Sequence, residues 1–308
     1  MDISLEHFYA RLGAIGLIIV LGFILGKLKL ISLETNRQIV NLLLTVFMPA
    51  SLFVAFPATY NTELAQLFFY GLVGGVVVML LLILLSKVIF MKGLYKGELR
   101  FESQFALIFN NATFLGYPIV TTTFGEAGII AYCGFIVAFN VALFSYGIYL
   151  FERKITPKLL GRVLTNPNIV AVVLGMVLYL SNVHPPEFAT DAVGFVGSAT
   201  TPLSVICIGY MLSRAKFSKL IKRWRLMLTA IIQLVVGPVA TYLALKFMHF
   251  PDEVVAVCTL IQALPTATSL GLFATKYGGN EIESSELVAI STIFSAGTLP
   301  VMVMLLLG

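Results

Sequence analysis

Charged residues are scarce in this sequence. Asp, Glu, Lys and Arg make up 11% of its 308 residues, and hydrophobic residues make up 59%. Soluble domains contain about 25% charged residues, so this chain has too few charges to cover a water-facing surface. Apolar runs of about 20 residues, the length that crosses a bilayer, recur along the whole chain. We therefore expect one integral membrane unit without a separate soluble domain, embedded in a lipid bilayer.

Cysteine and histidine are equally sparse. The three cysteines lie inside apolar runs, at Cys133, Cys207 and Cys258, which predicts buried thiols and no disulfide framework. The three histidines lie at the ends of runs or in loops, and no metal-ligand spacing occurs, so we expect no metal site. No G-x-S-x-G or H-E-x-x-H motif is present, and no histidine within an apolar run can activate a serine. The sequence therefore predicts no catalytic residues and a protein that is not an enzyme.

The apolar runs predict ten membrane-spanning helices. Their approximate ranges are 7–28, 35–56, 63–90, 100–124, 127–150, 167–181, 187–212, 224–248, 252–275 and 283–306. The connections after the odd-numbered helices carry 18 of the 20 Lys and Arg residues. Because basic residues mark the cytoplasmic side, we expect a multi-pass protein of the plasma or inner membrane with both termini extracytoplasmic. The net charge of +5 is accounted for by basic loops facing anionic lipid, so no nucleic-acid partner is implied.

Four prolines indicate an inverted repeat. Pro49 and Pro202 fall in the second helix of each predicted half, 153 residues apart, and Pro118 and Pro265 fall in the fourth, 147 residues apart. A five-helix unit ends on the opposite membrane face from where it began, so a second copy is inverted. We predict an all-α fold of two inverted five-helix repeats, residues 1–155 and 156–308.

The stretch FNNATFLGYP, residues 109–118, interrupts an otherwise apolar helix. Pro118 removes a backbone donor and Gly116 allows non-helical geometry, so we expect the helix to break at these two residues. Freed backbone groups are costly in lipid, and a break survives only inside protein or along a cavity. Asn110 and Asn111 can satisfy freed groups or offer donors to a ligand.

A second interruption is predicted around Pro265. Polar residues surround it, at Gln262, Thr266 and Thr268. Two interrupted helices at matched repeat positions favour a substrate site between them. Two structural kinks with polar side chains bonding to their own helices are the alternative.

Further candidate substrate contacts are Asn140, Ser51 and Ser204. Asn140 is isolated among apolar residues and can equally bridge two helices. Ser51 and Ser204 each follow a proline by two residues. No Lys or Arg is placed in the middle of a predicted span, which favours an anion held by helix N-termini and neutral donors. No cofactor is predicted. Three energy sources stay open: a proton gradient with Glu102 as the proton acceptor, Na⁺ bound at freed carbonyls, and the membrane potential alone.

These segments resemble the auxin efflux carrier family. The matching stretches are NNATFLGYPIVTTTFGEAG, NPNIVAVVLGMVL, TTPLSVICIGYML, and ALPTATSLGLFATKYGGNE running into STIFSAGTLPV. Their order and spacing cover essentially the whole chain, which looks like a compact microbial, PIN-like member with a fold similar to that of bile acid–sodium symporters. On this resemblance Asn111 and Pro118 match the family's crossover residues of helix 4, and Pro265 matches that of helix 9. Asn110 departs from the proline of plant carriers, so an auxin preference does not transfer.

The resemblance implies a secondary transporter of small organic anions. Its scaffold domain would consist of helices 1, 2, 6 and 7, and its transport domain of helices 3–5 and 8–10. The substrate would bind where helices 4 and 9 cross, and transport would proceed by elevator-type alternating access. Family substrates are auxin in plants and small carboxylates such as malate or malonate in microbial relatives. The resemblance also implies a homodimer, and G22FILG26 and G71LVGG75 both fit a small-xxx-small helix contact. An anion channel and a substrate-binding membrane sensor remain as alternatives.

Overall fold

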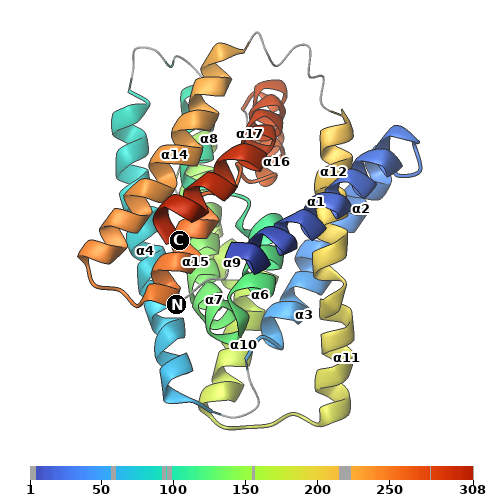
Figure 1. Cartoon of the computed structure of the whole chain (residues 1–308), viewed down its shortest axis with the longest axis vertical. Coiled ribbons are helices and arrows are strands. Elements are labelled where there is room, and N and C mark those ends of the chain that lie inside the picture. The colour runs from blue at the N-terminus through green and yellow to red at the C-terminus, as the bar shows by residue number, and fades with distance from the viewer. Residues whose placement is uncertain are drawn as a thin grey trace.

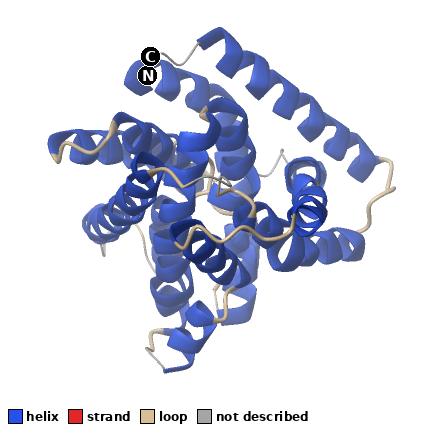
Figure 2. Cartoon of the chain, turned by 90° about the horizontal axis from the view of Figure 1, so that it is seen from below, coloured by secondary structure: helices blue, strands red, loops and turns tan. Residues whose placement is uncertain are grey.

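The computed structural model describes residues 5–56, 60–91, 95, 99–154, 157–214, 223–277 and 279–307. Over these residues the chain is helical with short connections and forms no strand longer than an isolated bridge (Figure 2). All of the predicted site residues lie within the described parts of the chain.

Helix occupies most of each range predicted as a span. In chain order the elements are α1 (Leu5–Lys27), α2 (Leu33–Leu42), the π-helical segment η1 (Leu43–Phe47), α3 (Met48–Phe53), α4 (Thr62–Ile89), α5 (Leu99–Ile108), η2 (Ala112–Gly116), α6 (Tyr117–Thr123), α7 (Gly125–Ala142), η3 (Leu143–Gly147), α8 (Ile148–Glu152), α9 (Pro157–Leu164), α10 (Pro167–Leu180), α11 (Glu187–Ser198), α12 (Thr200–Arg214), α14 (Trp224–Phe247), α15 (Asp252–Gln262), α16 (Ser269–Tyr277) and α17 (Glu281–Leu307). The short helix α9, between the fifth and sixth predicted spans, was not expected from the sequence.

Five helical stretches in the described residues are long and apolar enough to cross a membrane: Thr62–Ile89, Gly125–Glu152, Glu187–Arg214, Trp224–Phe247 and Glu281–Leu305. The apolar helices Leu12–Lys27 and Pro167–Leu180 are shorter. The regions of α2–α3, α5–α6 and α15–α16 are each divided into shorter segments. These observations confirm an all-α, multi-pass membrane protein.

The helices pack in two groups. In one group α1 lies along α12, and α3 packs on α10 and α11; in the other α4 lies along α7, and α14 packs on α5, α15 and α17. Figure 1 shows α1, α11 and α12 on one side of the molecule and α4 and α14 on the other. The segments η2 and α6 contact both groups, because they touch α12 as well as α7 and α15. The interrupted helix at residues 99–123 therefore lies where the groups meet.

Glycines allow the closest helix contacts inside each group. A side chain on Gly22 of α1 would overlap the Ile206 carbonyl of α12, and one on Gly71 of α4 would overlap the Ala131 carbonyl of α7. The two small-xxx-small patterns noted in the sequence are thus used for packing within the chain, and they give no support to the expected homodimer.

Candidate functional site

The two interrupted helices cross through paired backbone. Segments 109–111 and 265–267 run antiparallel, with Asn110 opposite Thr266 in an isolated β-bridge. Two hydrogen bonds join them: the Asn111 N–H donates to the Pro265 carbonyl at 2.7 Å, and the Ala267 N–H donates to the Phe109 carbonyl at 2.9 Å. Each break thus supplies partners for backbone groups freed by the other, as burial in a membrane protein requires.

The Asn110 side chain satisfies carbonyls at the end of α15. Its Nδ2 donates to the Gln262 carbonyl at 2.6 Å and to the Leu264 carbonyl at 3.2 Å. Gln233 of α14 donates a further hydrogen bond from Nε2 to the Leu264 carbonyl at 2.6 Å. The Leu264 oxygen therefore accepts two N–H groups, which uses both of its lone pairs.

Thr266 links the crossing to two other helices. Its N–H donates to Ser291 Oγ of α17 at 3.1 Å, and its hydroxyl donates to Gln233 Oε1 of α14 at 3.3 Å. All three of these side chains are buried. The crossing is therefore fixed to α14 and α17, and the Thr266 hydroxyl serves this network.

Asn111 begins the second half of its helix. Its side-chain oxygen accepts a hydrogen bond from the Phe114 N–H at 3.2 Å, so that it caps η2. The Tyr132 hydroxyl of α7 donates to the Ala112 carbonyl in the same turn at 3.1 Å. Both amides of the Asn–Asn pair therefore stabilise the interruption, one on each side of it.

The predicted position of the break was wrong. We expected the helix to open at Gly116 and Pro118, but α5 ends at Ile108 and the non-helical residues are 109–111. Gly116 has right-handed helical angles, φ −64° and ψ −51°. Pro118 follows the π-helical segment η2 within one run of helical residues that begins at Ala112, and π-helical segments are irregularities that occur inside helices. The break occurs earlier because the Asn111 side chain can cap the new helix, which Gly116 cannot do.

Gly116 is required for close packing instead. A Cβ placed on it would lie 3.2 Å from Leu264 Cδ1, and its neighbour on the other side is Ile261. The small residue therefore lets η2 approach the end of α15 at the crossing.

The other matched prolines accompany a second meeting of divided helices. Pro49 follows η1 by two residues, as Pro118 follows η2, and Pro202 lies in the first turn of α12 just after the break at Ala199. Ser51 Oγ donates to the Gly197 carbonyl at 2.7 Å and shares a 2.8 Å hydrogen bond with Thr200 Oγ1.

Ser51 therefore joins α3 to α11 and α12 rather than lying at the Asn110 crossing. The Tyr117 hydroxyl of α6 also lies close enough to Ser51 to interact with it. This contact connects the two helix groups.

The remaining candidates lie outside the crossing network. Ser204 donates to the Thr201 carbonyl of its own helix at 3.0 Å, and Asn140 Nδ2 donates to the Ile136 carbonyl of its own helix at 2.8 Å. Thr268 is partly exposed just before α16. The structure thus brings together Asn110, Asn111, Gln262, Pro265 and Thr266, and leaves Ser51, Ser204 and Asn140 bonded elsewhere.

Gln262 forms no side-chain hydrogen bond within the described part of the protein. Its side chain is fully buried, and neither Oε1 nor Nε2 has a hydrogen-bond partner among the described residues; the same holds for Asn110 Oδ1. Burying an amide without a partner is costly. These unpartnered atoms make Gln262 and Asn110 the leading candidates for ligand contact at the crossing.

Sequence reasoning missed Gln233 and Ser291. Gln233 stands alone in the apolar stretch IIQLVV, and its isolation in a buried helix is the signal that marked Asn140. Ser291 carries no such signal, because a serine in a helix usually bonds to its own backbone, as Ser291 also does with the Val288 carbonyl.

The described residues contain no group of three or more His, Cys, Asp or Glu side chains that could hold a metal ion. The three cysteines are free and buried. Glu102 on α5 is fully buried, and its Oε1 accepts a 2.7 Å hydrogen bond from the Asn280 N–H, immediately before α17.

Comparison with known proteins identifies the class of this chain. Residues 150–303 match the family model described as membrane transport protein. The chain is 24% identical over 305 residues to an uncharacterized transporter of Methanocaldococcus jannaschii, and the alignment covers 95% of both chains. The chain therefore belongs to the membrane transport protein family, that of the auxin efflux carriers, and is a multi-pass membrane transporter.

Proposed function

We propose that this transporter carries small organic anions, carboxylates such as malate or malonate or auxin-like acids, and binds them at the crossing of residues 109–111 with 265–267. The observation that carries the proposal is the buried, paired interruption itself, with the Gln262 amide unpartnered beside it. A mere pair of kinks has no need of a buried amide that bonds to nothing in the protein.

Helix ends at the crossing favour an anion. The segment η2 starts directly after 109–111, and α16 starts at Ser269, separated from 265–267 by a single residue. N-terminal N–H groups and the positive end of the helix dipole attract carboxylates. The residues of the crossing are neutral, so a carboxylate brings the only full charge.

We further propose a ten-helix inverted repeat that works by an elevator movement. In this proposal the two packing groups would serve as the scaffold and transport domains that the family resemblance implies, and the crossing would move with the transport group. The Tyr117–Ser51 contact joins the groups and would have to separate during each movement.

The driving force is proposed to be H⁺ or the membrane potential rather than Na⁺ at the crossing. The Leu264 carbonyl, freed by the break, already accepts two amide N–H groups, so it has no lone pair left for a cation. Transport should then persist when sodium is replaced by choline.

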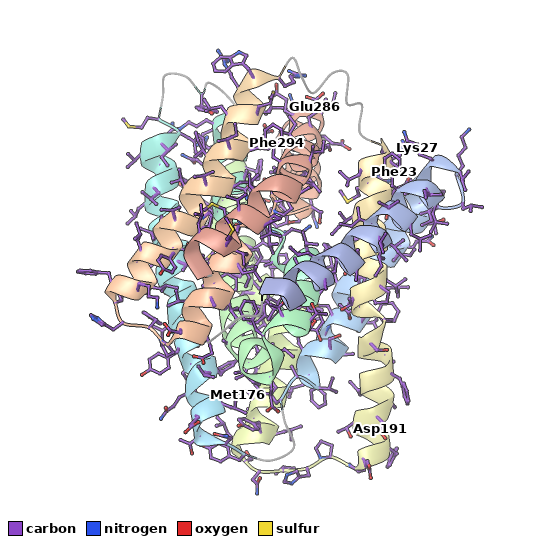
Figure 3. The ribbon with its side chains drawn as sticks, viewed as in Figure 1. Phe23, Lys27, Met176, Asp191, Glu286 and Phe294 are labelled. Atoms are coloured by element: carbon purple, nitrogen blue, oxygen red, sulfur yellow. The ribbon has the colours of Figure 1, made fainter. Side chains whose placement is uncertain are left out.

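We propose a cell-membrane location with both termini extracytoplasmic. Figure 3 shows Lys27 toward one end of the molecule and Asp191 at the other. This separation agrees with the basic residues lying on the cytoplasmic side.

The test is uptake by purified protein in proteoliposomes. We expect labelled malate or malonate to accumulate and to exchange in counter-flow, which a channel does not support, and to raise the melting temperature by binding the folded state. A response confined to neutral or cationic compounds contradicts the anion proposal. Thermal stabilisation without flux indicates a sensor.

Gln262→Met separates a binding role from a structural one. Removing an unpartnered buried amide should leave stability unchanged or raise it, while substrate affinity falls about 10-fold or more, as expected when a hydrogen bond to a charged group is lost. Asn140→Ala is the control, because its amide bonds to its own helix and transport should stay near wild type. Unchanged affinity in Gln262→Met would argue against substrate contact at this position.

A further inference from the structure

Three cations gather around aromatic rings at one end of α4, α5 and α8. Lys87 Nζ lies 5.6 Å from the centre of the Tyr146 ring. The Arg153 guanidinium carbon lies 3.3 Å from the centre of the Phe101 ring, and that of Arg100 lies 5.6 Å from the same ring. Both arginines are also within electrostatic range of the Tyr146 hydroxyl. We refer to these five residues as the basic–aromatic cluster.

The ion pairs of the described residues do not include the cations of this cluster. Among the described residues, ion pairs are formed by Arg223 with Glu283 and Glu286 and by Lys246 with Asp252, but by none of the three cluster cations.

The two guanidinium groups are instead positioned by neutral contacts. Arg100 Nε donates to the Phe90 carbonyl at 2.8 Å, and Arg153 is stacked on Phe101. Glu152, adjacent to Arg153 in the sequence, acts electrostatically on Tyr277. The cluster thus holds an uncompensated positive charge in fixed geometry.

An exposed apolar stripe leads to the cluster. Val73, Leu80 and Leu84 on α4 are 52%, 56% and 62% exposed. Lys87 falls on the same helical face, since residues spaced by three or four positions align. The exposed apolar stripe of α4 therefore ends at a cation, Lys87.

We propose that the basic–aromatic cluster binds the phosphate of an anionic phospholipid whose acyl chains lie along the α4 stripe. Arginine guanidinium groups form paired hydrogen bonds with phosphate oxygens, and tyrosine is favoured at the depth of lipid headgroups. The continuous apolar stripe favours a lipid over a soluble anion, because a soluble anion has no acyl chains to pack against the stripe. The bound lipid joins α4, α5 and α8.

The test uses purified protein in neutral detergent with added phosphatidylglycerol, phosphatidylcholine or inorganic phosphate. Phosphatidylglycerol should raise the melting temperature in a saturable manner, and the other two should not. In Lys87→Gln/Arg153→Gln the apparent affinity for phosphatidylglycerol should fall about 30-fold, from a roughly fivefold contribution by each cation. A fluorescent phosphatidylglycerol titration measures the same affinity independently of melting.

Lys27→Gln/Arg37→Gln is the matched control. It removes one Lys and one Arg from α1 and α2, at positions predicted to lie on the same membrane face, and should keep the wild-type affinity. An equal loss in both double variants means diffuse surface charge and overturns the site. If phosphatidylcholine raises the melting temperature as much as phosphatidylglycerol does, binding does not require an anionic headgroup. If inorganic phosphate raises it as much, binding does not require the lipid chains. Either result contradicts the proposal. Lys87→Arg/Arg153→Lys should retain most of the binding and shows that the positions tolerate substitution.

Discussion

Two pairs of divided helices meet in this molecule, and their backbones open to different extents. At the Asn110–Thr266 crossing both chains leave helical geometry for several residues and pair with each other. At the Ser51–Gly197 contact, η1 continues directly into α3, and only Ala199 separates α11 from α12. Matched prolines accompany both, so proline alone does not set the depth of a break.

The polar side chains differ accordingly. The wide break frees several carbonyls, and the amides of Asn110 and Gln233 reach them across the gap. The narrow break needs only the short hydroxyls of Ser51 and Thr200. Amides at an interruption therefore indicate an opened backbone, and hydroxyls a local irregularity.

The largest expected effect is that of Asn110→Ala. It leaves the buried Gln262 carbonyl without its Asn110 donor, so the free energy of unfolding should fall by about 1–3 kcal/mol, and transport should fall to background because the crossing loosens. Thermal unfolding in detergent and flux per folded protein measure both. Wild-type values of both would show that the Asn110 amide does not maintain the break.

Glycine substitutions at the two meetings should differ in size. A Cβ at Gly197 would lie 2.9 Å from the Ser51 backbone nitrogen, whereas a Cβ at Gly116 meets the tip of Leu264 at 3.2 Å. Backbone cannot yield as a leucine methyl can, so Gly197→Ala should cost about 1–3 kcal/mol and Gly116→Ala under about 1 kcal/mol. Melting temperatures of the two variants decide the order. The reverse order would mean that the Asn110 crossing is the tighter of the two.

Pro118→Ala and Pro49→Ala should have smaller and similar effects. Each proline lies two residues after a π-helical segment, where helical hydrogen bonding is already irregular, so stability should change by about 1 kcal/mol or less in either direction. Because the break is at 109–111, Pro118→Ala should reduce transport less than Asn110→Ala does. Complete loss of flux in Pro118→Ala with normal folding would place the critical opening at the proline after all.

Ser51→Ala should have the smallest effect. It removes the hydroxyl that bonds to Gly197 and Thr200, and such hydrogen bonds between membrane helices contribute about 0.6 kcal/mol on average. Melting should therefore shift little. The Tyr117–Ser51 contact is lost as well, so the flux rate tests whether this link between the helix groups restrains movement. A large drop in melting temperature would show that the hydroxyl network is as critical as the amide one.

The family and the membrane-embedded, all-α class were predictable from the sequence, and so was the presence of interruptions near Asn110 and Pro265. The exact residues of the break were not. Asn111 starts a new helix because its side chain caps the Phe114 N–H. This capping geometry has a stronger effect on the position of the break than Gly116 and Pro118 have.

Apolar run length, the distribution of basic residues and the chemistry of proline are local properties, so the sequence by itself determined that the chain is a bilayer-spanning helical protein with divided helices. Only the tertiary structure decided how the breaks are stabilised. Asn110 bonds to a carbonyl 152 residues away, and Gln233 and Ser291 reach the crossing from two other helices. Freed backbone groups in a membrane protein must be satisfied by whatever packs against them, and that neighbour is set by folding rather than by adjacent sequence.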